Sequence, residues 1–278
     1  MLELETIREE SKMCDNVNTT QNAQFGSHDN KFVSQENNYY GPSLTDVYNF
    51  AMALFRDNFP KLREEAAKIA EERAKEFCQT TMKKLESTDP QKYSAFKDPD
   101  MQYVLFEAQK TYARFGTHEM LEVLTELISA RVDVDSETIL KVSIDKAIEI
   151  APVLNDAQLD YLSILFLCTR TENPTIATID ELKAYLEIVA DNFNQADFSA
   201  VYYLNMMGCL QLRLNNTIKN LSEAYGFSIK EVEEICPEII KKTTGDYTTS
   251  HTGTVLAIIN IQRKIGSKLK LNLKDWMN

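Results

Sequence analysis

Glycine and proline are scarce in this chain, with 8 and 7 copies among 278 residues. Such a low content of turn-forming residues disfavours sandwiches, barrels and disordered chains, and it is typical of helical proteins. Wholly apolar runs are also short, for example Ile164–Cys168, whereas a membrane-spanning helix needs ~18 apolar residues. Met1–Lys12 lacks the pattern of a signal peptide. These absences predict an all-α protein located in the cytoplasm.

Basic residues are outnumbered: 30 Lys and Arg stand against 42 Asp and Glu, which gives a formal net charge of −12. Nucleic acids and anionic membranes attract basic surfaces, so both are disfavoured as partners. The cysteines are odd in number and show no CxxC spacing, and most lie inside apolar helical patterns. We expect reduced thiols that fill the core, at Cys14, Cys78, Cys168, Cys209 and Cys236.

The common signatures of enzymes are missing from the sequence: G-x-G-x-x-G, the P-loop, G-x-S-x-G and H-E-x-x-H. His118 and Glu122 come nearest to a metal motif, but a site needs a third ligand, and His28 and His251 are the other histidines. We therefore predict a non-enzymatic protein without metal or cofactor. An active site assembled from residues far apart in the sequence remains an open alternative.

Apolar residues recur at helical spacing from Leu44 onward, and the strongest pattern covers 61–86. Pro60 predicts a kink or a restart before this helix. If the two helical segments were continuous, residues 44–85 would span ~60 Å and act as an arm or stalk. Further helices are predicted over 98–116, 117–132, 136–151, 155–169, 178–193, 199–215, 217–225, 228–242 and 252–264, with an extended piece at 268–273.

The predicted fold class is therefore all-α, with a long N-terminal helix packed with or projecting from a multi-helix bundle, and with a disordered or β-prone N-terminal tail. We divide the chain into an Asn/Gln-rich tail or assembly segment (1–43), a long helical arm (44–97), a helical core (98–245) and a C-terminal helix with a short extended piece (246–278). The packing or oligomer face of the long helix consists of Leu62, Ala66, Ile69, Ala70 and Phe77.

The N-terminal segment differs from the rest of the chain, since nine Asn or Gln residues lie between Asn16 and Asn38. Amide side chains form ladders between stacked copies of a strand, and Phe32 and Val33 are strand-forming residues. A flexible polar tail and a peptide-like docking motif are the alternatives to self-association. We place the self-association surface on Phe25, Gly26, Asn30, Phe32, Val33, Gln35 and Tyr39.

Two other functions have a local pattern in their favour. Residues 221–235 have the spacing of a helix-turn-helix around Gly226, although the second helix is rich in Glu, which repels phosphate. Residues 44–59 carry three Phe residues on a helix, as in membrane-active helices, but offer only Arg56 as a basic residue. DNA-binding regulation and membrane activity are therefore kept as alternatives.

The motifs along nearly the whole chain resemble an uncharacterised family of bacterial helical proteins. Members have a Gly-x-Asn-Ser-like front segment containing Gln and a helix of the pattern N-F-x-K-L-x-x-x-A-x-x-x-A-x-x-R-A. That helix pattern is matched by Asn58, Phe59, Lys61, Leu62, Ala66, Ala70, Arg73 and Ala74. The C-terminal pattern G-x-x-I-A-x-x-N…G…L-x-x-W is matched by Gly253, Ala257, Asn260, Gly266, Leu273 and Trp276, with Val255–Leu256 where the family tends to have an isoleucine.

The family has no established activity, so the resemblance implies none for this chain. Its front segments resemble short amyloid-like or β-pairing motifs of bacterial immune signalling proteins, which implies a place in defence against phage. Ser27–Asn30 replaces the more usual Gly-Asn/Asp-Asn-Ser run of that motif. We expect an interaction and assembly protein, a defence effector or adaptor, that self-associates through its N-terminal segment and long helix. Its partners would be copies of itself, or a protein with a similar segment.

Overall fold

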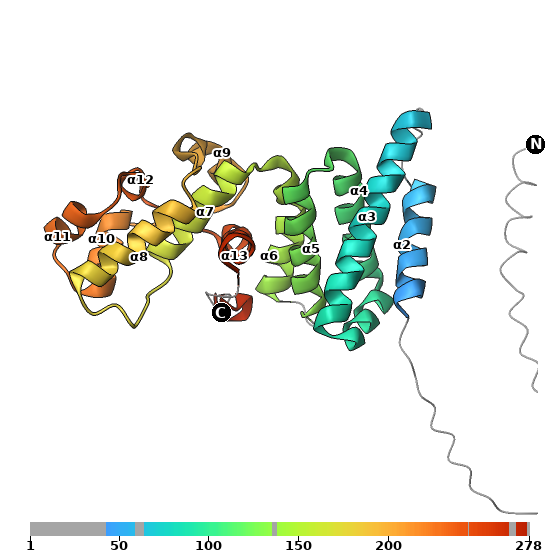
Figure 1. The fold of residues 1–278 in the computed structure, drawn as a ribbon, viewed down its shortest axis with the longest axis horizontal. Coiled ribbons are helices and arrows are strands. Elements are labelled where there is room, and N and C mark those ends of the chain that lie inside the picture. The colour runs from blue at the N-terminus through green and yellow to red at the C-terminus, as the bar shows by residue number, and fades with distance from the viewer. Residues whose placement is uncertain (1–42, 59–63, 135–137, 244, 267–270, 277–278) are drawn as a thin grey trace, which may run out of the picture. The chain divides into compact units, whose positions relative to one another are not determined.

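The computed structural model describes residues 43–58, 64–134, 138–243, 245–266 and 271–276. All of them belong to the second of the two units into which the chain divides, Tyr40–Asn278. Helices make up most of this described part, which confirms the predicted all-α fold (Figure 1). Each helix in it is too short or too polar to cross a membrane.

The elements follow one another with short connections. The α-helices are α2 Leu44–Asn58, α3 Glu64–Thr88, α4 Pro99–Phe115, α5 His118–Val132, α6 Ile139–Ile150, α7 Asp156–Thr169, α8 Ile179–Asn192, α9 Val201–Met206, α10 Thr217–Tyr225, α11 Ile229–Ile235, α12 Glu238–Lys241 and α13 His251–Ile265. The 3-10 helices are η1 Pro90–Lys97, η2 Ala151–Val153, η3 Phe198–Ala200 and η5 Leu273–Trp276. The strands are β1 Leu210–Leu212 and β2 Tyr247–Thr249.

Helix boundaries follow the capping residues of the sequence. Asp98 caps α4 by accepting a hydrogen bond from the Asp100 backbone, and Pro99 occupies the first turn. Gly116 ends the same helix in the left-handed conformation, with a φ of 63°. Capping boxes open α7, α8 and α11, and they are formed in α8 by Thr178 with Glu181 and in α11 by Ser228 with Glu231.

The capping boxes predict a pH dependence of stability. Hydrogen bonds from the Ala177 and Thr178 backbone lower the pKa of Glu181, and those from Ser228 lower the pKa of Glu231. A carboxyl whose folded-state pKa is lowered contributes stability above its unfolded pKa of about 4.3, and loses it as the pH falls through the folded value. The free energy of unfolding, measured by urea titration between pH 5 and pH 3, is therefore expected to fall less steeply in the variant Glu181→Gln/Glu231→Gln.

The control for that comparison is Glu64→Gln/Glu65→Gln, which makes the same change of charge in the first turn of α3 without touching a capping box. If both double variants flatten the pH profile equally, net charge rather than capping explains the effect.

Helix α2 folds back on α3 instead of continuing it. The Arg56 guanidinium near the end of α2 lies 3.0 Å from the Glu71 carboxylate of α3, and the two helices pack side by side (Figure 1). Helix α3 then packs on α4 and α5, and Phe77 and Leu85 are completely buried. The long helix is thus packed into the bundle over most of its length, and a continuous stalk of 44–85 does not form.

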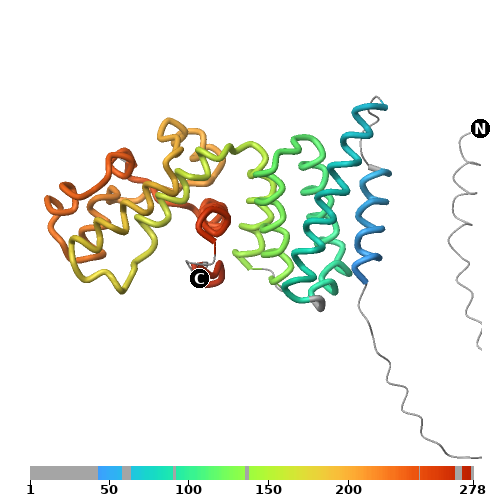
Figure 2. The backbone as a smooth tube through the Cα atoms, in the orientation of Figure 1, coloured from blue at the N-terminus to red at the C-terminus, as the bar shows by residue number. Residues whose placement is uncertain are grey.

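Helix α13 holds the second part of the bundle together, because it packs against α5, α6 and α7. Its apolar side chains from Val255 to Ile259 are buried, as are those of α7 from Leu162 to Leu167. Helix α10 packs on α7, while α11 and α12 pack on α8 (Figure 2). The last helix in the sequence therefore forms part of the core.

The predicted helix over 199–215 is wrong in its second half. Helix α9 ends at Met206, and Gly208 turns the chain with a φ of 74°. Strand β1 follows and pairs antiparallel with β2, with Leu210 opposite Thr249 and Leu212 opposite Tyr247. The local pattern predicted a helix, but this segment forms a strand because pairing with a distant segment satisfies the backbone hydrogen bonds of both strands.

Four other predicted segments differ from the structure in their bounds. Pro237 splits the predicted helix 228–242 into α11 and α12, because proline lacks the backbone N–H that a continuous helix needs. Helix α6 is capped by Thr138 and begins at Ile139 rather than at 136, and α13 is capped by Ser250. The predicted extended piece 268–273 runs into the 3-10 helix η5, and residues 268–270 lie outside the described residues.

Candidate functional site

The predicted self-association surface of the N-terminal segment lies outside the described residues. It comprises Phe25, Gly26, Asn30, Phe32, Val33, Gln35 and Tyr39. The boundary between the two units of the chain, after Tyr39, lies at the end of this surface. The segment thus falls in the first unit, Met1–Tyr39, whereas α2–α13 belong to the second.

The predicted packing or oligomer face of α3 has an exposed and a buried half. Ala66 is exposed and Ile69 is 50% exposed, whereas Ala70 is 4% exposed and Phe77 is completely buried. Leu62 lies outside the described residues. The buried half packs within the bundle, so only the N-terminal end of this predicted face is exposed to a partner.

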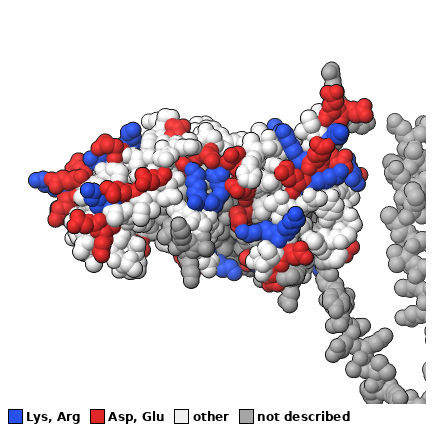
Figure 3. Space-filling view, viewed as in Figure 1, with Lys and Arg blue, Asp and Glu red and all other residues white. Residues whose placement is uncertain are grey.

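That exposed end of α3 consists of Glu64–Ile69, and we call it the α3 tip. All of its side chains are exposed. Because Arg56 at the end of α2 pairs with Glu71, the tip extends past the last turn of α2 (Figure 1). Its exposed residues Glu64, Glu65 and Lys68 are charged, so Ile69 is an apolar residue in a charged segment. Figure 3 shows further charged side chains spread over one face of the molecule.

A second exposed apolar surface lies around α9 and β1. Tyr202 and Met206, one turn apart on α9, are 80% and 79% exposed. Leu212 at the end of β1 is 77% exposed, and Leu214 beyond it is 98% exposed. Large apolar side chains exposed to this degree over a short stretch of chain are typical of surfaces that bind other proteins.

The residues weighed for metal binding or reactivity stay apart. His118 lies 3.4 Å from Glu122 on the surface of α5, and no third ligand joins them among the described residues. Cys78, Cys168, Cys209 and Cys236 are buried free thiols, as predicted. Burial raises the pKa of the Cys78, Cys209 and Cys236 thiols to about 12, so these thiols stay protonated and fill space.

The two patterns that suggested DNA or membrane binding have ordinary packing roles. Helices α10 and α11 meet at Gly226, and α11 buries Val232 while Glu233 and Glu234 are exposed. Helix α2 buries Val47 and Phe55 inside the bundle. An acidic second helix repels phosphate, and an apolar face already buried has little left for a membrane.

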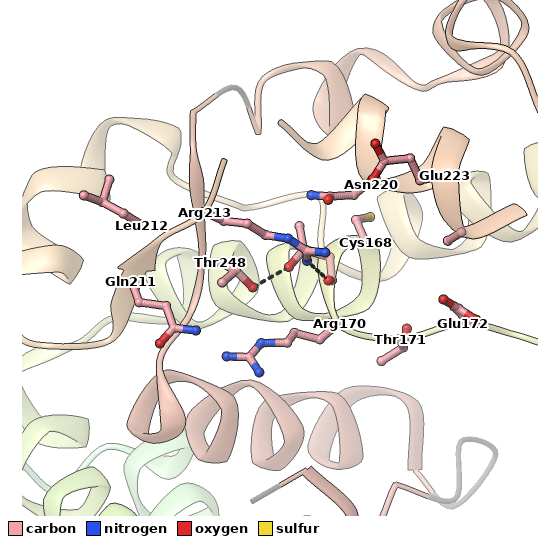
Figure 4. Close-up of a pocket in the computed structure, with 12 residues that line it drawn as sticks. Cys168, Arg170, Thr171, Glu172, Gln211, Leu212, Arg213, Asn220, Glu223 and Thr248 are labelled. Atoms are coloured by element: carbon pink, nitrogen blue, oxygen red, sulfur yellow. Dashed lines mark hydrogen bonds between the residues drawn. The ribbon is translucent and has the colours of Figure 1, made fainter. Parts of the chain in front are cut away.

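A cavity lies where α7 ends beside β1, β2 and α10. It has a volume of about 580 Å³. Figure 4 shows Arg170, which follows α7, and Arg213, which follows β1, reaching into it from different elements. The other lining residues are mostly polar: Cys168, Thr169, Thr171, Glu172, Gln211, Leu212, Asn220, Glu223, Ala224 and Thr248. We call this cavity the arginine pocket.

Backbone carbonyls hold both guanidinium groups in place. Arg170 Nη2 donates to the carbonyl of Thr249 at 2.7 Å, and Arg213 Nη1 donates to the carbonyl of Thr169. The backbone N–H of Arg213 donates to the Asp246 carbonyl at 2.5 Å, which extends the strand pairing to this residue. The small sheet therefore positions Arg213 opposite the end of α7.

The arginine pocket is lined by two guanidinium groups and by the carboxylates of Glu172 and Glu223. Burial, and then the positive charge of Arg213, lowers the pKa of Arg170. Among the described residues, neither arginine forms a salt bridge with a carboxylate. Glu223, on the α10 side, instead accepts a hydrogen bond from the Asn215 side chain at 2.9 Å. Two like charges thus share a partly enclosed space.

Sequence reasoning missed this pocket because its arginines are 43 positions apart and its strands were not predicted. Arg170 lies just after a predicted helix, and Arg213 lay inside one. The signal that was available is the turn formed by Gly208 followed by Leu210–Leu212, an alternating run that opposes the Thr-rich run Thr248–Thr249.

Comparison with known proteins places the helical unit in a family. The model of an uncharacterised protein family matches residues 41–250. The matched range runs from α2 to β2, so it contains the whole arginine pocket and leaves out α13. No curated protein and no solved structure matches the chain significantly.

Proposed function

The chain belongs to this uncharacterised family, and from that premise we propose that it is a non-enzymatic interaction protein that assembles with copies of itself. Assembly proceeds through the N-terminal segment and is supported by the α3 tip. A protein that carries a similar N-terminal segment is the alternative partner. The helical unit Tyr40–Asn278 remains folded when the segment is engaged or removed.

The observation that carries this proposal is the exposure of the α3 tip. The rest of α3 is packed against α2, α4 and α5, yet Glu64–Ile69 are exposed and include the half-exposed Ile69. An apolar side chain on a projecting helix end favours helix–helix contact with a second copy, with charged neighbours forming the rim. The exposed side chains around α9 and β1 offer a further contact surface.

The resemblance of the N-terminal segment to β-pairing motifs of bacterial immune signalling proteins supports a biological role for the assembly. We extend the proposal to a defence effector or adaptor that acts against phage. In that role, pairing of amide-rich segments recruits further copies, because each strand offers its backbone and its Asn and Gln side chains to the next.

The segment is tested by a pair of single substitutions. Val33→Asp places a charge in the proposed strand, where stacked copies would bring like charges together, and it is expected to shift the protein to smaller species in sedimentation velocity. The matched control Val17→Asp makes the same change outside residues 18–41 and is expected to leave the distribution unchanged. Equal behaviour of the two variants contradicts the proposed pairing surface.

The contribution of the α3 tip is tested separately. Ile69→Asp is expected to raise the concentration at which the protein assembles, by about tenfold for the loss of ~1.4 kcal/mol of apolar contact. The control is Ile229→Asp on α11, because Ile229 is 51% exposed and Ile69 is 50% exposed. Concentration-dependent light scattering checks both variants, and an unchanged assembly concentration for Ile69→Asp removes the tip from the proposal.

The two alternatives are tested by their own assays. Salt-dependent retention of the full chain on duplex DNA favours a regulator that uses 221–235, and release of dye from anionic liposomes favours a membrane-active 44–59. The exposed Glu233 and Glu234 and the buried Val47 and Phe55 weigh against these outcomes.

A further inference from the structure

Two arginines line the arginine pocket, and neither forms a salt bridge with a carboxylate of the described residues. Arg170 enters from the end of α7 and Arg213 from the residue after β1 (Figure 4). Bringing two guanidinium groups into one partly enclosed cavity costs free energy, since each loses water and each repels the other. An anion in the cavity removes both costs, because it replaces the lost water and neutralises the repulsion.

Each arginine uses only part of its donors to hold its place. One Nη atom of each donates to a backbone carbonyl, that of Thr249 or Thr169. Arg170 Nε is buried and has no hydrogen-bond partner among the described residues. A guanidinium group has five N–H donors, so both arginines keep donors for a ligand.

A buried acceptor faces the same cavity. Asn220 is 4% exposed and lines the pocket from α10, and its Oδ1 atom has no hydrogen-bond partner among the described residues. Its amide nitrogen donates to the Asn215 carbonyl at 3.3 Å, which sets the orientation of the amide group. A buried unpaired acceptor costs free energy, and a hydrogen-bond donor on a ligand recovers that loss.

From these contacts we propose that the arginine pocket binds a small phosphate ester. Arg170 and Arg213 hold the phosphate, and Asn220 Oδ1 accepts a hydrogen bond from an N–H or O–H group on the rest of the molecule. Glu172 and Glu223, which line the pocket as well, offer further acceptors to that part. Nucleoside monophosphates have this chemistry, with an anionic head and donors on the sugar and base.

Geometry favours phosphate over carboxylate. A carboxylate offers two oxygens in one plane, whereas the phosphate of an ester has three outward oxygens arranged tetrahedrally, which suits two forks that approach from different elements. The cavity of about 580 Å³ lies within the usual range of ligand pockets, roughly 300–1,000 Å³. A mostly polar lining suits a polar ligand.

The test is calorimetric titration of the full chain with four probes: adenosine monophosphate, inorganic phosphate, glutamate and adenosine. Adenosine monophosphate is expected to bind, and adenosine is expected to bind at least tenfold more weakly because it lacks the phosphate. If inorganic phosphate binds as tightly as adenosine monophosphate, the pocket does bind phosphate, but its ligand is the free anion rather than an ester. Binding of glutamate alone overturns the preference for phosphate.

Substitutions assign the binding to this pocket. Arg213→Gln is expected to weaken adenosine monophosphate binding about tenfold to a hundredfold, the range of a charge-assisted hydrogen bond. Arg213→Lys keeps the charge but loses the fork, and it is expected to weaken binding less. Arg170→Gln is expected to behave like Arg213→Gln, and Arg114→Gln, an exposed arginine on α4, is the control.

Circular dichroism separates loss of binding from loss of fold. The proposal is supported if Arg213→Lys retains both the helical spectrum and measurable binding. Arg213→Gln should then retain the spectrum but lose the binding. Equal affinity of Arg213→Gln, Arg170→Gln and Arg114→Gln for the ester, or the absence of binding by the unsubstituted chain, overturns it. None of these results depends on whether the chain assembles.

Discussion

Asp160→Ala is expected to lower the free energy of unfolding by about 3–5 kcal/mol, the cost of breaking a buried ion pair. Asp160 on α7 is completely buried, and its carboxylate lies 2.7 Å from Lys264 Nζ on α13. It also accepts a hydrogen bond from the Asn260 side chain at 3.0 Å. Its removal leaves a mostly buried ammonium and a buried amide donor without this partner, at the contact between the two helices.

The measurement is urea unfolding followed by far-ultraviolet circular dichroism. Asp156→Ala is the matched control, because Asp156 also joins α7 to α13, through Arg263 at 2.7 Å, but its side chain is 31% exposed. That variant is expected to lose about 1 kcal/mol, as partly solvated pairs do. Adding Lys264→Met to Asp160→Ala is expected to recover part of the loss. Equal losses in the free energy of unfolding for Asp160→Ala and Asp156→Ala would contradict the claim that burial makes the Asp160 pair the more costly one to break.

Gly253→Ala is expected to destabilise the protein by about 1–3 kcal/mol, the range for overpacking. Gly253 lies in the first turn of α13, where alanine would ordinarily stabilise a helix by roughly 0.5–1 kcal/mol. An added Cβ, however, would overlap the carbonyl oxygen of Cys209. That oxygen accepts a hydrogen bond from the Ser250 backbone at 2.9 Å, beside the strand pair. The sign of the effect therefore decides between sterics and helix propensity.

The control is Gly226→Ala, which strains a backbone with a φ of 72° but meets no atom within 4 Å. Both variants are expected to lose stability. Hydrogen exchange of the β1 amides, measured by mass spectrometry, distinguishes them, because only the overlap at Cys209 pushes β1 away from α13. Faster exchange of β1 in Gly253→Ala alone is the expected result, and unchanged exchange in both contradicts the steric explanation.

Most of the fold follows from signals that lie close together in the sequence. Asp98, Pro99 and Gly116 bound α4 as predicted, because a cap, a proline and a left-handed glycine act on their own backbone. The same holds for the capping boxes at Thr178 and Ser228. Local backbone chemistry is sufficient wherever a helix needs only its own residues to begin and end.

Features made by distant residues did not follow from the sequence. The short alternating run Leu210–Leu212 lay inside a predicted helix, and its pairing with Tyr247–Thr249 makes it a strand. The arginine pocket depends on that pairing, since it brings Arg213 to Arg170. The split of the α3 face at Ile69 likewise depends on where α2 ends against α3, which periodicity within one helix does not determine.

The most direct test of the proposed assembly is the absolute mass in solution, by light scattering, of the full chain and of a chain that starts at Pro42. If the N-terminal segment drives assembly, the full chain is expected to form a large or heterogeneous assembly. The shortened chain is expected to form a much smaller species with an unchanged helical spectrum, because it keeps the helices of the unit Tyr40–Asn278. Equal masses for the two chains would contradict assembly through this segment. Residues 1–41 would then be a polar tail.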